Sequence, residues 1–163
     1  MSTFERHYDE SVMLPVKPEE IFSYIDDHSR FSSHMSKSSW MMGGGHMDVT
    51  VDDGKGQKVG SHIRLNGAVF GIPVSLDEVI TQHEAPYVKS WRTVGIPKLI
   101  IIGQYSMSLK ISRDHEQTRF TVSIDYDLPT DATRWLGLFF GNIYAQWCVR
   151  QMIRGTKEHF SSQ

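Results

Sequence analysis

Hydrophobic and polar residues alternate along most of the chain, which is typical of strands in a sheet that has one buried and one solvated face. The alternation is cleanest at residues 118–128, where Phe120, Val122, Ile124, Tyr126 and Leu128 share one face. Turns containing glycine or proline separate this stretch from others like it. The pattern predicts an antiparallel sheet of about seven strands. Their expected ranges are residues 4–14, 46–53, 59–67, 74–83, 87–94, 99–111 and 118–128.

Helical patterns follow the first strand and end the chain. Pro18 and the acidic pair after it suit the first turn of a short helix over residues 18–27. A second short helical turn should come next, followed by a Met- and Gly-rich loop at residues 41–47 that we interpret as a hinge. A long helix without proline is predicted over residues 133–160. This order indicates a single α+β domain over residues 1–163, with the long helix on the apolar face of the sheet.

The predicted C-terminal helix is apolar on nearly every side in its first half and amphipathic in its second. At 100° per residue, one stripe runs its full length and is expected to face the sheet. A second stripe is confined to the first half. Either loops and the short helices cover this second stripe, or it lines a ligand cavity or a homodimer interface. The first stripe holds Trp135, Leu138, Ala145, Val149, Met152, Ile153 and Phe160; the second holds Leu136, Phe139, Phe140, Ile143, Tyr144 and Trp147.

Motifs spread over nearly the whole chain support the same arrangement. They are VMLPVKPEEIFSYIDD at residues 12–27, KVGS at 58–61, EVITQHEAPYVKSWR at 78–92, and TRFTVSIDYDLP at 118–129, which leads into the long helix. In order and spacing they resemble the START/Bet v 1-like (SRPBCC) superfamily, in particular its polyketide cyclase/dehydrase and lipid-transport branch. The resemblance implies a helix-grip fold, in which a curved antiparallel sheet of about seven strands wraps around the C-terminal helix. The Met- and Gly-rich residues 41–47 depart from the family pattern.

The resemblance also implies an apolar cavity between sheet and helix, with a volume on the order of several hundred Å³. For each candidate wall residue taken alone, plain core packing is the favoured interpretation, and only the resemblance makes the group as a whole a cavity wall. The polar residues considered for orienting a ligand are Arg64, Glu78, Arg92 and Gln104, and Glu78 and Arg92 either form an ion pair or remain a solvated pair. The predicted ligand-binding residues are Trp91, Tyr105, Met107, Phe120, Val122, Ile124, Tyr126, Phe140, Tyr144 and Trp147.

Two functions follow from the resemblance. The first is binding or transport of a small hydrophobic ligand such as a lipid, an isoprenoid, a quinone or an aromatic polyketide. The alternative is an enzyme of the aromatase/cyclase type, which would need an inward-facing acid or base such as Glu78 or Tyr126. The sequence assigns no catalytic residue and leaves open whether the protein is an enzyme.

The composition of the chain limits the classes of partner that the protein is expected to bind. A net charge of −2 argues against nucleic-acid binding, and the single Cys148 cannot form an intrachain disulfide. No metal-ligand spacing and no phosphate- or dinucleotide-binding motif occurs, so we expect neither a metal nor a cofactor. The apolar stretches are shorter than the ~20 residues of a membrane span, and the N-terminus is polar, so we expect no membrane insertion and a cytoplasmic location. A small hydrophobic molecule is the expected partner, with a homodimer as a further possibility.

Overall fold

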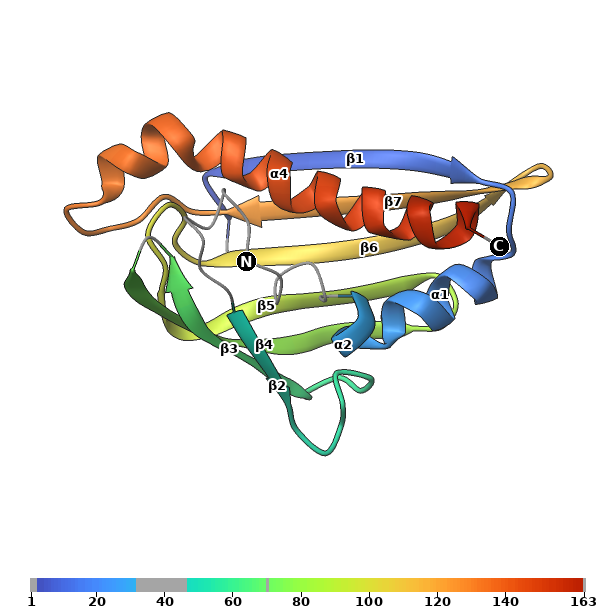
Figure 1. Cartoon of the computed structure of the whole chain (residues 1–163), viewed down its shortest axis with the longest axis horizontal. Helices are drawn as coiled ribbons and strands as arrows, with labels where there is room; N and C mark the ends of the chain where they lie inside the picture. Colours follow the sequence, from blue (N-terminus) through green and yellow to red (C-terminus); the bar gives the residue numbers. More distant parts are fainter. Residues whose placement is uncertain (1–2, 32–46, 70, 163) are drawn as a thin grey trace.

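The alternating stretches form a seven-stranded antiparallel sheet along which the C-terminal helix lies (Figure 1). The structure is a computed structural model that describes residues 3–31, 47–69 and 71–162. The elements follow in the order β1 (Arg6–Leu14), α1 (Pro18–Asp26), α2 (His28–Phe31), β2 (Met47–Val51), β3 (His62–Val69), β4 (Ile72–Glu84), β5 (Val88–Lys98), β6 (Tyr105–Asp114), β7 (Gln117–Tyr126) and α4 (Arg134–Ser161). The predicted helix-grip arrangement is thereby confirmed.

The sheet has the strand order β1-β7-β6-β5-β4-β3-β2, so the N-terminal strand pairs with the last strand. The clean alternation of β7 is reproduced: Phe120, Val122, Ile124 and Tyr126 are each at most 1 % exposed. Two register irregularities between β4 and β5 bend the middle of the sheet, as β-bulges do. The bend gives the sheet the curvature that encloses an interior beside α4.

Helix α1 begins at Pro18, in the first turn predicted for it. The backbone N–H of Lys17 donates to the Glu20 carboxylate at 2.8 Å, which satisfies one of the free donors at the helix start. The buried face of α1 consists of Ile21, Phe22 and Ile25. Helices α1 and α2 lie beside the C-terminal end of α4, where Tyr24 stacks on His159 with ring centroids 4.2 Å apart (Figure 1).

Helix α4 packs its two halves differently. The second half buries Val149, Met152 and Ile153, as the helical pattern predicts. In the first half the buried positions are all small residues, Gly137, Gly141 and Ala145. A Cβ built on Gly137 would lie 2.5 Å from Pro129 Cδ and 2.8 Å from the carbonyl oxygen of Ile101. Glycine at this position therefore allows the helix to approach the β5–β6 loop closely.

Large apolar residues of the first half consequently point outward. Leu138 and Trp135, expected to face the sheet, are 51 % and 56 % exposed, so that prediction is wrong for these two positions. Figure 1 shows the reason: the first turns of α4 extend beyond the start of β1, so β1 does not run alongside them. We call the exposed group the apolar end of α4; it consists of Trp135, Leu138, Phe139, Phe140 and Ile143.

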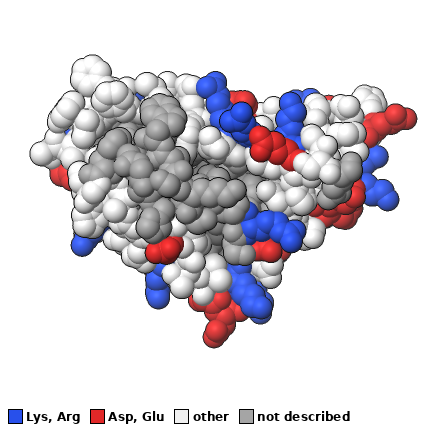
Figure 2. Space-filling model, viewed as in Figure 1, with Lys and Arg blue, Asp and Glu red and all other residues white. Residues whose placement is uncertain are grey.

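Figure 2 shows the same division by charge. On the face shown, Lys, Arg, Asp and Glu side chains gather over the second half of α4, whereas the described atoms around the first half are mainly uncharged. Arg150 pairs with Glu10 at 3.1 Å and Arg154 with Glu158 at 3.2 Å. In the described part of the chain, no helix is long and apolar enough to cross a membrane.

Substituting the two glycines of α4 that differ in their surroundings tests this packing. We expect Gly137→Ala to lower the free energy of unfolding by about 2 kcal/mol or more, because the new Cβ meets backbone and a proline ring. Gly155→Ala is the matched control: its Cβ would meet only the Tyr24 hydroxyl at 3.8 Å, and alanine should stabilise the helix by about 0.5–1 kcal/mol. Chemical denaturation measures both, and equal effects would contradict the close approach.

The apolar end of α4 also gives the predicted homodimer a test. If two chains associate through it, Phe139→Asp should halve the mass measured by light scattering, since Phe139 is 72 % exposed and would be buried in the dimer. Lys157→Asp, on the charged half of the same helix, is the control and should leave the mass unchanged. A monomer in all three proteins would exclude a dimer of this kind.

Candidate functional site

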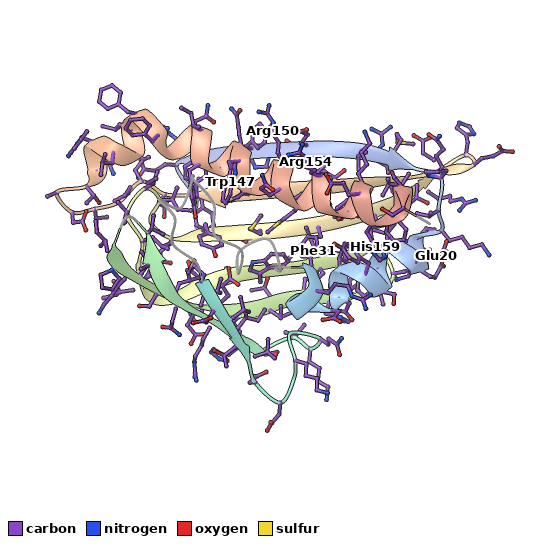
Figure 3. All side chains as sticks on the ribbon, in the orientation of Figure 1. Glu20, Phe31, Trp147, Arg150, Arg154 and His159 are labelled. Carbon is purple, nitrogen blue, oxygen red and sulfur yellow. The ribbon has the colours of Figure 1, made fainter. Side chains whose placement is uncertain are left out.

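A cavity of about 50 Å³ lies between the sheet and α4. Its wall is almost entirely apolar and draws on all the strands except β1, as well as on α2, α4 and the β5–β6 loop. The described lining residues are Phe31, Met47, Leu65, Leu76, Glu78, Trp91, Leu99, Ile102, Tyr105, Met107, Ile124, Tyr144, Trp147, Cys148 and Met152. Phe31 and Trp147, labelled in Figure 3, show how α2 and α4 contribute to the wall from different elements.

The cavity is smaller than the several hundred Å³ expected from the sequence, because long side chains occupy the interior. Three of them are methionines, Met47, Met107 and Met152. A second cavity of about 20 Å³ lies next to the first, lined in part by Val69, Val74 and Ile100. The two cavities are separated by side chains that line both, namely Met47, Leu99, Ile102 and Tyr144. Methionine is unbranched and changes rotamer readily, so the Met47 side chain between the two cavities can move at low energetic cost.

Six of the ten predicted ligand-binding residues line the cavity: Trp91, Tyr105, Met107, Ile124, Tyr144 and Trp147. Phe120, Val122 and Tyr126 are buried on the same face of β7 but pack in the core outside the described lining. Phe120 and Val122 pair with Ile111 and Leu109 of β6, on the side of Ile124 away from the Tyr105–Tyr126 pair. Tyr126 lies against the helix where a Cβ on Gly141 would be 3.4 Å from its ring.

Phe140 is the tenth predicted residue, and it lies outside the cavity. Its side chain belongs to the apolar end of α4 and is 46 % exposed. On this part of the helix the buried positions are Gly137 and Gly141, one on each side of Phe140 in the sequence. Aromatic character alone could not distinguish Phe140 from Tyr144, one turn further on, which does line the cavity.

Sequence reasoning missed several wall residues. Leu65 of β3 and Leu76 of β4 sit on the buried face of alternating strands, so strand alternation contained the signal for both. Cys148 follows Tyr144 by one helical turn, which places both on the cavity side of α4. The remaining wall residues come from four other places. They are Phe31 at the end of α2, Met47 on the edge strand β2, Leu99 and Ile102 in the β5–β6 loop, and Met152 on the buried stripe of α4.

Glu78 is the single acidic residue of the described wall, and it is 3 % exposed. It accepts a hydrogen bond from the Tyr105 hydroxyl. Burial raises the pKa of Glu78 to about 7, and the interactions of Tyr105 and Trp91 with the carboxyl oppose that rise only in part. The carboxyl therefore changes its charge near neutral pH inside an apolar chamber.

The phenols and the thiol around Glu78 stay protonated. Burial and the neighbouring Glu78 carboxylate raise the pKa of Tyr105. The neighbouring Cys148 thiol and burial raise the pKa of Tyr144. Burial raises the pKa of Cys148 to about 12, so this thiol is not a nucleophile at neutral pH.

The other polar candidates lie outside the cavity. Arg64 is exposed and sits 3.7 Å from Asp77, and Gln104 is exposed with its amide donating to the Gly95 carbonyl oxygen. Glu78 and Arg92 form neither the ion pair nor the solvated surface pair considered from the sequence, because Glu78 is buried. Glu78 is paired with Thr93 across the sheet, so Arg92 points to the opposite, solvated face. No Lys, Arg or His occurs among the described lining residues, and no three metal-ligating side chains gather in the described part of the chain. Of the Met- and Gly-rich loop predicted as a hinge, residues 41–46 lie outside the described residues.

Comparison with known proteins agrees with this geometry. The family model described as polyketide cyclase/dehydrase and lipid transport matches residues 5–160. No curated protein sequence matches the chain significantly.

Solved structures share the fold at low sequence identity. A norcoclaurine synthase point mutant from Thalictrum, in complex with a transition-state analogue, has a TM-score of 0.68 at 9 % identity, covering 99 % of this chain and 98 % of that one. A protein from Thermus thermophilus has a TM-score of 0.65 at 12 % identity, covering 96 % and 98 %. The protein Ara h 8.0201 has a TM-score of 0.60 at 11 % identity, covering 97 % and 99 %. The chain thus belongs to the polyketide cyclase/dehydrase and lipid-transport family of the START/Bet v 1-like superfamily.

Proposed function

We propose that the protein binds a small hydrophobic molecule, such as a lipid, an isoprenoid, a quinone or an aromatic polyketide, in the cavity between the sheet and α4, and that it does so as a single cytoplasmic domain. The observation that carries the proposal is an apolar chamber with one buried carboxyl group, Glu78, on its wall. Burial of apolar ligand surface would supply most of the affinity, and Glu78 would orient the ligand.

Uptake of such a ligand requires the chamber to enlarge. The side chains that separate the two cavities are the ones to move, Met47 and Leu99 foremost, because their displacement would join the two spaces. Both cavities adjoin the β5–β6 loop, and Tyr144, in the first half of α4, lines the two of them. The ligand would therefore extend from Glu78 toward that loop.

Binding of the neutral fluorescent probe N-phenyl-1-naphthylamine tests the proposal. The wild-type protein should bind it saturably, with energy transfer from the tryptophans at the cavity wall, Trp91 and Trp147. Cys148→Trp should weaken binding at least tenfold because the indole fills the chamber. Gln146→Trp, two positions away on α4, adds the same side chain outside the described lining and is the matched control.

The comparison of the two variants decides the result. Equal binding by wild type, Cys148→Trp and Gln146→Trp would show that the probe sits elsewhere, for example on the apolar end of α4. Should Cys148→Trp unfold in thermal melts, Cys148→Phe provides the smaller block at the same position. A native mass spectrum of the protein purified without detergent would identify the ligand carried from the cell.

A buried acid with a pKa of about 7 also favours a second candidate, an enzyme of the aromatase/cyclase type. In that function Glu78 would move a proton to or from a bound ketone, with Tyr105 holding the carboxyl in place. Glu78→Gln should then abolish turnover of an aromatic polyketone while retaining binding of the neutral probe. Bound hydrophobic material in the native spectrum, combined with no turnover of such ketones, would count against the enzyme.

A further inference from the structure

We propose that the ligand of this cavity carries a hydrogen-bond-donating head group, a protonated amine above all, that pairs with Glu78, and that the cavity discriminates against carboxylates. The inference rests on the proposed function and adds the chemical class of the ligand. It follows from the free acceptor positions of the buried Glu78 carboxyl and from the charges of the wall around it.

The phenol that contacts Glu78 is already engaged. The Tyr105 hydroxyl donates to Glu78. A phenol has only one O–H, so Tyr105 cannot donate to a ligand without leaving Glu78. A ligand that offers only acceptors would thus have to break this pair to bond to Tyr105.

The Glu78 carboxylate can still accept further hydrogen bonds. A carboxylate offers about four lone-pair positions, and the hydrogen bond from Tyr105 to Glu78 occupies one of them. A ligand O–H or N–H group that reaches Glu78 would find an acceptor that is already oriented. Leaving such an acceptor without a donor when an apolar molecule displaces water would cost about 1–3 kcal/mol, which disfavours ligands with no donor at all.

The charges around Glu78 determine which hydrogen-bond-donating head groups the cavity favours. The groups that face Glu78 are Tyr105 from β6, Trp91 from β5, and Tyr144 and Cys148 from α4. All four are neutral, and the described lining contains no Lys, Arg or His. The nearest further charge is that of Asp77 beside it on β4, which is also acidic. A cationic head group would therefore neutralise a buried negative charge, whereas an anionic one would double it.

Three ligands with the same naphthalene ring and different head groups test the inference. They are 2-(1-naphthyl)ethylamine, 2-(1-naphthyl)ethanol and 1-naphthaleneacetate, titrated calorimetrically at pH 8, where the Glu78 carboxyl is mainly ionised. We expect the amine to bind about tenfold more tightly than the alcohol, and the carboxylate to bind at least another tenfold more weakly.

Two substitutions identify the group responsible. Glu78→Gln should bring the amine and the alcohol within about threefold of each other, because the charge is gone while size is kept. Glu84→Gln, which removes an exposed carboxylate from the end of the same strand, should leave the preference for the amine intact. If Glu78→Gln does not fold, the wild-type protein supplies the readout: affinity for the amine should fall as the pH drops below 7, while affinity for the alcohol should not.

The possible failures are distinguishable. A carboxylate that binds as tightly as the amine, or a preference for the amine that survives Glu78→Gln, would overturn the ligand class and leave the binding function standing. Failure of all three ligands and of N-phenyl-1-naphthylamine to bind would remove the binding function, and this inference with it.

Discussion

Replacing Asp26 by alanine should lower the free energy of unfolding by about 3–5 kcal/mol, because it leaves a buried ammonium group without its counter-ion. Lys89 of β5 has a side chain that is 0 % exposed, and its Nζ donates to Asp26 Oδ1 at 3.0 Å and to the Asp26 carbonyl oxygen at 3.2 Å. Burial lowers the pKa of Lys89, while the hydrogen bond to Asp26 and its charge raise it in opposition. His83 Nε2 lies 2.8 Å from the same carboxylate oxygen.

These contacts fasten the last residue of α1 to β4 and β5, and they hold one end of the interior closed. Substituting both partners should be far less costly than substituting one. We expect the double variant Asp26→Ala/Lys89→Met to recover most of the loss, because no buried charge then remains unpaired. Urea denaturation of the wild type, the two single variants and the double variant measures the coupling. Additive effects in that cycle would show that the pair is not coupled.

A second large effect concerns pH. Glu78 has a pKa of about 7 in the folded protein against an ordinary value of 4.5. Between these values the folded protein holds a proton that the unfolded chain has released, so the free energy of unfolding falls as the pH rises through this window. The loss from Glu78 amounts to about 3 kcal/mol and is complete above pH 7.

Glu78→Gln should remove this component, so the variant should lose much less stability than the wild type between pH 4.5 and pH 8. The contributions of other groups, such as the raised pKa of the His7 imidazole on the outer face, are common to both proteins and cancel in the difference. Urea denaturation at half-unit pH intervals gives both curves. Parallel curves would mean that Glu78 is not held neutral by burial.

The sheet and its partner helix could be predicted because their signals are local. Alternation in β7 places Phe120, Val122 and Ile124 on one face whatever the rest of the chain does. The Pro18 start of α1 and the unbroken run of α4 are likewise local signals. Family resemblance supplied the remaining step, from a list of elements to the helix-grip arrangement.

The first half of α4 shows which feature of the packing the hydrophobic pattern of the sequence could not predict. Helical periodicity assigns large apolar residues such as Leu138 to the buried face. In the structure the helix approaches its neighbours through Gly137, where a Cβ would lie 2.8 Å from the carbonyl oxygen of Ile101, so a side chain has no room. The contact lies between segments far apart in the sequence, so the sequence of the helix alone does not reveal it.

The candidate site shows the same limit. Alternation could place Glu78 on the inner face of β4, but its partner depended on strand register. Glu78 pairs with Thr93 rather than Arg92, so the ion pair or solvated pair considered from the sequence is replaced by a buried carboxyl that accepts a hydrogen bond from Tyr105. Cavity volume depends on how the long side chains fill the interior, which periodicity does not determine.

The central claim is that the space between the sheet and α4 takes up a hydrophobic molecule by displacing methionine side chains. Methyl NMR of protein labelled at the methionine methyl groups tests it most directly, with N-phenyl-1-naphthylamine as the titrant. The signals of Met47, Met107 and Met152, which line the cavity, should shift and saturate together, while Met13 on β1, 36 % exposed and outside the described lining, should remain unchanged. Unshifted signals from the three wall methionines at saturating probe would contradict the claim.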